Sequence, residues 1–264
     1  MTWIAAYAAA GAFVGFLAGL LGIGGGMTLV PILSALFAAQ ALAPEHTVHL
    51  ALGTAMASII FTSSASVRAH HKRGAVDWNV VRALAPGMVL GALLATLASG
   101  FISQRALALA FAAIVYAGAA QMLVGGRPSA TRGQPATPGM VAVGIAIGVV
   151  CGLVSAGGAF LTVPFMVYCG VSVLTAIGTA AAVGIPVALV GTAGFIASGW
   201  RVDDLPAATL GFVFLPALAA LVVGSVVMAP VGAHFAHRLP VATLKRIFAL
   251  LLFALATKMA VTYW

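Results

Sequence analysis

The first apolar segment of the chain is too long to be a single membrane-spanning helix. Residues 2–43 contain no charged side chain. As one helix they would measure about 63 Å at about 1.5 Å per residue, whereas the hydrocarbon core of a bilayer is about 30 Å thick. The segment must fold back, and its middle, "GLLGIGGGMTLVP" (19–31), holds three consecutive glycines. Each glycine costs a helix roughly 1 kcal/mol relative to alanine, so we expect the break there.

The rest of the chain predicts an all-α integral membrane protein. Hydrophobic residues make up 63% of the sequence, charged residues 6%, and the mean hydropathy is +1.17. A water-soluble domain has about 25% charged residues, and apolar runs of this length suit helices rather than barrel strands. The apolar segments lie at about 2–43, 46–67, 78–99, 105–124, 139–170, 172–198, 205–232 and 241–263.

The formal charge of +8 does not indicate nucleic-acid binding. The basic residues lie in short loops between apolar segments, which is the pattern of a membrane-topology signal. The N-terminal segment has no basic region before its apolar run, so we expect it to stay in the protein. We expect a multi-pass protein of a bacterial inner membrane. Cys151 and Cys169 lie in apolar segments and suggest neither a disulfide framework nor a metal site.

The chain consists of two similar halves. "ALGTA" (51–55) is answered by "AIGTA" (176–180), and the polar stretch "GGRPSATRGQPATP" (125–138) separates the halves. We predict a first transmembrane repeat at 1–124, a cytoplasmic linker at 125–138 and a second repeat at 139–264. With one constant offset, Gly11, Gly15, Gly19, Gly24, Gly25, Val30 and Pro31 recur as Gly144, Gly148, Gly152, Gly157, Gly158, Val163 and Pro164.

We predict that the two repeats are inverted. A broken or re-entrant helical hairpin followed by three transmembrane helices gives each half an odd number of crossings. Basic residues favour the cytoplasmic side, and this topology gives a better split of charge than single spans do, with both termini in the periplasm. One side receives Arg68, Lys72, Arg73, Arg82, Arg127, Arg132, Arg238, Lys245 and Arg246, and the other Arg105, Arg201 and Lys258.

The matching breaks predict a substrate site for a small oxyanion. Interrupted helices at corresponding places in two repeats are typical of transporter binding sites. Each restarting helix presents free N–H groups and a partial charge of roughly +0.5, and glycine lets an anion approach the backbone. The predicted substrate-binding residues are Gly24, Gly25, Gly26 and Thr28 in the first half, Ser155, Gly157, Gly158 and Thr162 in the second, and Thr54 and Thr179 in the segments that follow.

Structural roles compete with this interpretation. The clustered glycines could serve only packing or a hairpin turn. The hydroxyls of Ser58, Thr62 and Ser63 are expected to bond to the preceding helical turn, and for Thr54 and Thr179 both roles stay open. The series beginning at Gly11 and its copy beginning at Gly144 are expected to serve close helix packing.

These motifs resemble the TauE/SafE family of sulfite exporter-like transporters. The resemblance rests on "GFLAGLLGIGGGMTLVPIL", "GVVCGLVSAGGAFLTVPFM", the glycine–threonine starts of the following helices and "HRLPVATLKRIFALLLFALATKM", and it spans essentially the whole chain. It implies a transporter of sulfite, a sulfonate such as sulfoacetate, or a related small sulfur oxyanion, with export as the expected direction and uptake of thiosulfate, sulfate or a sulfonate as the alternative. Ser155-Ala156 stand where the first half has Gly22-Ile23, so the two half-sites need not be equivalent.

The carboxylates predict no proton relay in the middle of the membrane, and we expect no cofactor. The carboxylates Glu45, Asp77, Asp203 and Asp204 all fall at segment ends or in loops. Coupling needs no carboxylate, because the membrane potential drives anions outward by about 2.3 kcal/mol per charge per 100 mV.

Histidine pairs suggest a metal only weakly. His46 and His49, and likewise His234 and His237, have ligand-compatible spacing, but the predicted topology places the pairs at opposite faces. A histidine-metal intramembrane enzyme is therefore the less favoured alternative, and we expect no metal. His49 alone is a candidate for gating or proton sensing. The expected partners are the oxyanion and the bilayer, and a homodimer is left open.

Overall fold

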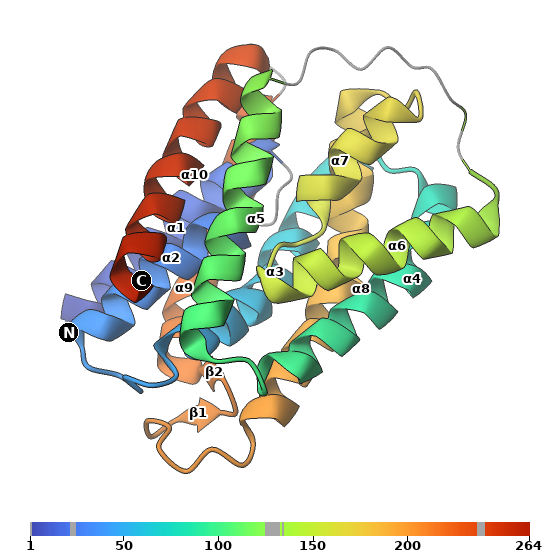
Figure 1. Cartoon of the computed structure of the whole chain (residues 1–264). Helices are drawn as coiled ribbons and strands as arrows, with labels where there is room; N and C mark the ends of the chain where they lie inside the picture. The colour runs from blue at the N-terminus through green and yellow to red at the C-terminus, as the bar shows by residue number, and fades with distance from the viewer. Residues whose placement is uncertain (1, 22–24, 125–132, 134, 237–240) are drawn as a thin grey trace.

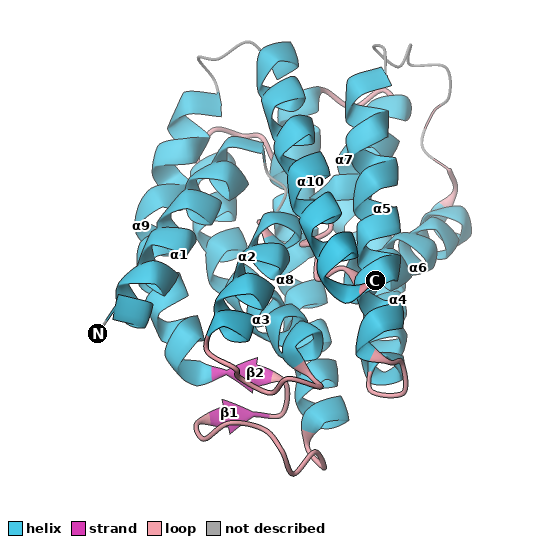
Figure 2. Ribbon diagram, turned by 60° about the vertical axis from the view of Figure 1, so that its left-hand side comes forward, coloured by secondary structure: helices cyan, strands magenta, loops and turns pink. Residues whose placement is uncertain are grey.

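The structure is a computed structural model that describes residues 2–21, 25–124, 133, 135–236 and 241–264. Helices make up almost all of the described chain (Figures 1 and 2). The helices of the first half are α1 (Thr2–Leu21), α2 (Gly26–Ala39), α3 (Thr47–His71), α4 (Trp78–Ser99) and α5 (Gln104–Val124). Those of the second half are α6 (Thr137–Leu153), α7 (Ala159–Tyr168), α8 (Val173–Gly199), α9 (Leu215–Ala236) and α10 (Val241–Tyr263).

The prediction of an all-α membrane protein is confirmed. In the described parts of the chain seven helices are long and apolar enough to cross a membrane, namely α1, α3, α4, α5, α8, α9 and α10. The helices α2, α6 and α7 are shorter. Each half therefore has a broken pair of helices followed by three long ones. Most of the linker at 125–138 lies outside the described residues.

The predicted span at 205–232 is wrong at its start. α9 begins at Leu215, and strands β1 (Thr209–Leu210) and β2 (Val213–Phe214) form a short antiparallel hairpin before it. Gly211 makes the turn at φ +52° and lies against the backbone of Ile196 in α8. Since the hairpin is itself apolar and partly buried, hydropathy does not distinguish it from the beginning of a helix.

The predicted packing glycines are confirmed, and they join the two halves. A Cβ at Gly15 of α1 would overlap the backbone of Ser225 in α9, and one at Gly148 of α6 would overlap the backbone of Met88 in α4. Small residues of this kind let helix backbones touch inside a membrane. The first helix of each half thus packs on the fourth helix of the other half. Gly11, Gly144 and Gly152 meet their neighbours in the same way.

The first helix pair folds back on itself. Gln40, at the end of α2, donates a hydrogen bond from Nε2 to the hydroxyl of Tyr7 in α1 at 2.6 Å. The rings of Tyr7 and Phe37 pack edge to face with centroids 6.0 Å apart. Because α2 ends beside the start of α1, the chain reverses direction at the glycine break.

Candidate functional site

The two helix breaks lie against each other in the centre of the protein. α2 begins directly after Gly25 and α7 directly after Gly158, and both cap glycines have positive φ, +74° and +87°. A Cβ at Gly26 would overlap the carbonyl oxygen of Ser155, so the start of α2 touches the second break. Gly26 and Ser155 are both buried. Gly24, which was predicted to join this site, lies outside the described residues.

Each restarting helix presents backbone N–H groups at the crossing. The first bonds of α2 run from the N–H groups of Thr28 and Leu29 to the carbonyl of Gly25, and in α7 the N–H of Thr162 donates to the carbonyl of Gly158. In each helix, the N–H groups of the residues before these first donors have no acceptor within that helix. Such groups are the natural ligands of a small anion.

The predicted hydroxyl donors point at the protein itself. Thr28 Oγ1 donates to the carbonyl that caps its own helix at 2.8 Å, and Ser155 Oγ donates to the carbonyl of Leu52 in α3 at 2.8 Å. Thr162 Oγ1 lies 3.7 Å from Met88 Sδ. A hydroxyl has one proton, so in this conformation these three groups do not offer it to an anion.

Thr54 and Thr179 join the two halves at opposite ends of the molecule. Thr54 Oγ1 accepts the N–H of Phe214, just before α9, at 2.9 Å. Thr179 Oγ1 accepts the N–H of Asp77, just before α4, at 2.8 Å. The two bonds occupy corresponding positions of the repeat. Both threonines thus have a structural contact, and a role in substrate binding stays a prediction.

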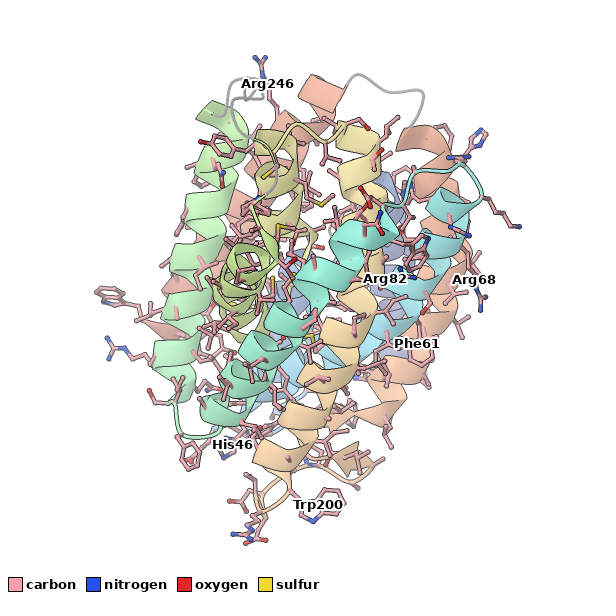
Figure 3. All side chains as sticks on the ribbon, turned by 90° about the vertical axis from the view of Figure 1, so that its right-hand side faces the viewer. His46, Phe61, Arg68, Arg82, Trp200 and Arg246 are labelled. Carbon is pink, nitrogen blue, oxygen red and sulfur yellow. The ribbon has the colours of Figure 1, made fainter. Side chains whose placement is uncertain are left out.

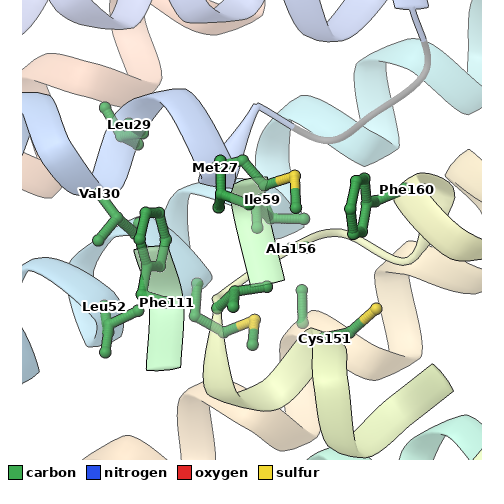
Figure 4. Close-up of a cluster of buried hydrophobic side chains, with 14 of the residues drawn as sticks. Met27, Leu29, Val30, Leu52, Ile59, Phe111, Cys151, Ala156 and Phe160 are labelled. Atoms are coloured by element: carbon green, nitrogen blue, oxygen red, sulfur yellow. The ribbon is translucent and has the colours of Figure 1, made fainter. Parts of the chain in front are cut away.

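Apolar side chains surround the crossing of the breaks. Figure 4 shows Met27 of α2, Ile59 of α3 and Phe160 of α7 around Ala156 of the second break. The ring of Phe160 occupies space that a side chain at Gly118 of α5 would fill. No Asp, Glu, Lys or Arg is buried in the described part of the chain. An anion at the crossing would therefore be bound by neutral donors, whose dipoles act strongly in such low-dielectric surroundings.

The second break also lies close to the hydroxyl of Ser63, which was expected to bond to the preceding turn of its own helix. A Cβ at Gly184 of α8 would lie 2.5 Å from the carbonyl oxygen of Gly157 and 3.1 Å from Ser63 Oγ of α3. Ser63 is 2% exposed, and its hydroxyl has no hydrogen-bond partner within the described residues. The expected back-bond is present for Ser58 and Thr62 but wrong for Ser63. The signal in the sequence was the hydroxyl-rich run "FTSSAS" (61–66).

His49 lies in the first turn of α3, at the opposite end of that helix from His70. Its Nε2 is 3.1 Å from the carbonyl oxygens of both Ser99 and Ile102, so the imidazole holds α3 to the end of α4. The ring also packs on Phe212 at a centroid distance of 4.9 Å and lies 5.5 Å from the ring of His46. Its Nδ1 has no hydrogen-bond partner among the described residues.

The described residues contain no group of three histidine, cysteine or acidic side chains that could hold a metal ion. His237, one of the four paired histidines, lies outside the described residues.

A cavity of about 230 Å³ opens between α2 and α10. Its polar lining residues are Ser34, Lys258, Thr262 and Tyr263, with Ser34 Oγ and the Tyr263 hydroxyl 2.6 Å apart. None of the residues of the breaks lines it. The exposed Lys258 is the only charged residue among its described lining residues.

Known proteins resemble the chain over almost its full length. The family model for the sulfite exporter TauE/SafE matches residues 7–259. A probable membrane transporter protein of Haemophilus influenzae is 36% identical over 250 residues, which cover 94% of this chain and 95% of the relative. The probable membrane transporter protein YdhB of Bacillus subtilis is 26% identical over 239 residues, covering 88% and 90%. A probable membrane transporter protein of Xylella fastidiosa is 28% identical over 255 residues, covering 93% and 90%. No solved structure matches the chain significantly.

Proposed function

This chain belongs to the TauE/SafE sulfite exporter family, and on that premise we propose that it is an anion transporter and not an enzyme. The proposed substrate is sulfite or a related small sulfur-containing oxyanion, including organosulfonates such as sulfoacetate. The proposed direction is export across a bacterial inner membrane, by a secondary transporter or a facilitator. The observation that carries the proposal is the buried contact between the two helix breaks, at Gly26 and Ser155.

Substrate binding is proposed to depend on the backbone. The starts of α2 and α7 supply N–H groups and the positive ends of two helix dipoles, and left-handed Gly25 and Gly158 let the anion come close to the chain. Thr28, Ser155 and Thr162 would have to rotate away from their present acceptors to add hydroxyl donors. Gly157 would contribute through its position beside Gly158.

The proposed topology is an inverted repeat. α3 and α8 occupy corresponding places in the two halves and lie antiparallel in the structure. Gly53 near the start of α3 contacts Phe195 near the end of α8, while Gly178 near the start of α8 contacts His70 near the end of α3. Corresponding helices that cross in opposite directions support halves that are upside down relative to each other.

The distribution of basic residues supports an assignment of one end of the molecule to the cytoplasm and the other to the periplasm. The end of the molecule at which α3 ends and α4 begins has the exposed residues Arg68 of α3, Lys72 and Arg73 of the following loop, and Arg82 of α4; we call it the basic end, and the opposite end the outer end. Figure 3 shows Arg68, Arg82 and Arg246 toward the first, and His46 and Trp200 at the second. The Arg105 guanidinium, at the outer start of α5, lies 5.8 Å from the centroid of the Trp264 ring. The positive-inside rule then favours a cytoplasmic basic end and periplasmic termini.

Export needs no buried acid. The inside-negative potential favours outward movement of an anion by about 2.3 kcal/mol per charge per 100 mV. Uptake of thiosulfate, sulfate or a sulfonate is the alternative, since the geometry of the crossing is compatible with either direction. We also propose that His49 gates the outer end, because it connects α3 to the residues that follow α4.

Gly158→Ala tests whether transport depends on the backbone at the break. A Cβ at Gly158 would have Met88 Cε at 3.1 Å as its nearest neighbour, and that methyl group can move. The remaining cost is the left-handed conformation, about 1–2 kcal/mol. We expect efflux of radiolabelled sulfite from proteoliposomes to fall about tenfold or more, with sulfate and sulfoacetate competing in the wild type.

Gly74→Ala is the matched control. Gly74 has a similar φ of +67° in the loop after α3, with no described atom within 4 Å of a Cβ. This variant has the same conformational cost without touching the breaks, and its flux should match the wild type. Equal flux in both variants would contradict backbone binding, and no wild-type flux from folded protein would contradict the substrate assignment.

A further inference from the structure

The outer half of the α3–α8 interface is filled by large apolar side chains. Met56 of α3 lies against Gly191 of α8, with Cε 2.8 Å from where a glycine Cβ would be. Phe195 of α8 lies against Gly53 of α3. Met56 and Phe195 are both fully buried, so this half of the interface is closed by hydrocarbon.

The half toward the basic end has small residues on α8, and α3 contributes polar residues together with Val67, which packs on Ala181 and Ala182. Ser63 of α3 faces Gly184, and His70 faces Gly178. Ala181 lies on α8 between these two glycines and is 2% exposed. Large apolar side chains like those of the outer half are therefore absent from these described positions.

The repeat does not dictate this asymmetry. The offset that aligns Gly53 with Gly178 would allow the same residue types at both ends, because each position of α3 has a counterpart on α8. In the sequence Met56 corresponds to Ala181, Ser66 to Gly191, and His70 to Phe195. The basic half of the interface has thus acquired polar side chains where the outer half has apolar ones.

Two hydroxyls in this half of the interface have no acceptor among the described residues. Ser63 and Ser66 are each 2% exposed, and neither hydroxyl forms a hydrogen bond within the described part of the chain. Their neighbours Ser58 and Ser64 donate to carbonyls of their own helix at 2.8 and 2.6 Å. Buried polar groups nearly always have partners, so two unpaired ones require an explanation. Ser63, Ser66 and His70 are spaced by three and four residues and share one helix face.

We propose that Ser63 and Ser66 donate hydrogen bonds to the substrate anion, and that the inner half of its pathway runs along this face of α3 between the second break and the basic end. The proposal rests on the transport function proposed above. Ser63 and the carbonyl of Gly157 both lie next to Gly184, so the proposed pathway begins at the second break. Neutral hydroxyls suit the ionised oxygens of a sulfite or sulfonate group, which only accept hydrogen bonds. The exposed cations of the basic end raise the local anion concentration at its mouth.

Alanine variants test the contact with substrate. A hydrogen bond to a charged group contributes enough free energy that Ser63→Ala and Ser66→Ala should each raise KM or lower flux about tenfold. Ser64→Ala is the control, because Ser64 is one residue away on the same helix and donates to the Ile60 carbonyl. Its flux should stay within about twofold of the wild type. Thermal unfolding in detergent shows whether the serine variants remain folded.

Cysteine labelling tests the pathway without transport. Ser63→Cys, Ser64→Cys and Ser66→Cys are placed in protein carrying Cys151→Ala and Cys169→Ser. They are treated in inside-out vesicles with sulfonatoethyl methanethiosulfonate, a small reagent that is itself a sulfonate. We expect Ser63→Cys and Ser66→Cys to be labelled, sulfoacetate to slow the labelling, and Ser64→Cys to remain unlabelled. Sulfite is omitted because it cleaves disulfides.

The outcomes separate this proposal from the proposed function. Wild-type flux with normal Ser63→Ala and Ser66→Ala variants, or with no labelling at either position, would overturn the pathway and leave the transporter intact. Labelling that sulfoacetate slows, in protein without any flux, would support an anion pathway and contradict the proposed transport. Loss of flux in the Ser63→Ala and Ser66→Ala variants, together with cysteine labelling that sulfoacetate slows, supports both the pathway and the transport function.

Discussion

At the scale of single residues, the acceptor to which a hydroxyl donates its hydrogen bond decides whether that hydroxyl can also bind an anion. The sequence pattern predicted Thr28 and Ser155 as substrate donors at the breaks and expected Ser63 to bond to its own helix. The structure separates them, because Thr28 and Ser155 donate to carbonyls while Ser63 has no acceptor among the described residues. That difference depends on which backbone lies across from each side chain, so residue type and spacing do not predict it.

His49 allows a prediction about proton sensing. Its Nε2 proton is shared between two carbonyls, so a second proton would sit on Nδ1, which has no acceptor in the described chain and faces His46. Acidification should therefore loosen the outer end and increase the flux of labelled sulfoacetate, whose charge is constant at mildly acidic pH.

Two glutamine variants check this prediction. His49→Gln keeps a donor for the carbonyls of Ser99 and Ile102 but does not titrate, so its flux should be independent of pH. His46→Gln should keep the wild-type profile. A His49→Gln variant with the wild-type pH profile would remove His49 from any sensing role.

At the scale of elements, glycine spacing predicted how helices pack but not which helices pack together. The series at Gly11 and Gly144 indicates close approach, and the structure shows it. The partner in each case is a helix of the other half, α9 for α1 and α4 for α6. Neither partner is adjacent in sequence, so only tertiary structure identifies them.

Gly148→Val is expected to destabilise the protein. The added side chain would overlap the backbone of Met88, which cannot rotate away as a side chain could. Overpacking of this kind costs about 1–3 kcal/mol or more, so the thermal unfolding midpoint should fall by several degrees. Gly133→Val is the control, because no described atom lies within 4 Å of a Cβ there. An unchanged midpoint in Gly148→Val would show that α4 and α6 are not in backbone contact.

At the scale of the whole molecule, exchanged contacts hold the two halves together. Thr54 binds the chain before α9 and Thr179 binds the chain before α4, so each half accepts an N–H from the other. Such reciprocal contacts couple movement at one end of the molecule to the geometry at the other. A transporter whose halves rock around a central site needs this kind of connection.

The proposed inverted topology predicts the location of the termini. Alkaline phosphatase fused after Trp264 should be active, and green fluorescent protein fused there should be dark, because both report on the periplasmic side. The same reporters inserted in the linker near Gly133 should give the opposite pattern. Matching patterns at the two positions would contradict an odd number of crossings in the second half.

The sequence alone determined the membrane class, the approximate bounds of most apolar segments, the broken first segment of each half and the packing role of the glycine series. These properties follow from local hydropathy and helix propensity, which act over a few turns of chain. Tertiary structure decided the hairpin before α9, the packing of α1 on α9 and of α6 on α4, and the lack of a hydrogen-bond partner for Ser63 and Ser66 among the described residues. Each of these depends on contacts between residues far apart in sequence, whose geometry exists only once the helices have packed.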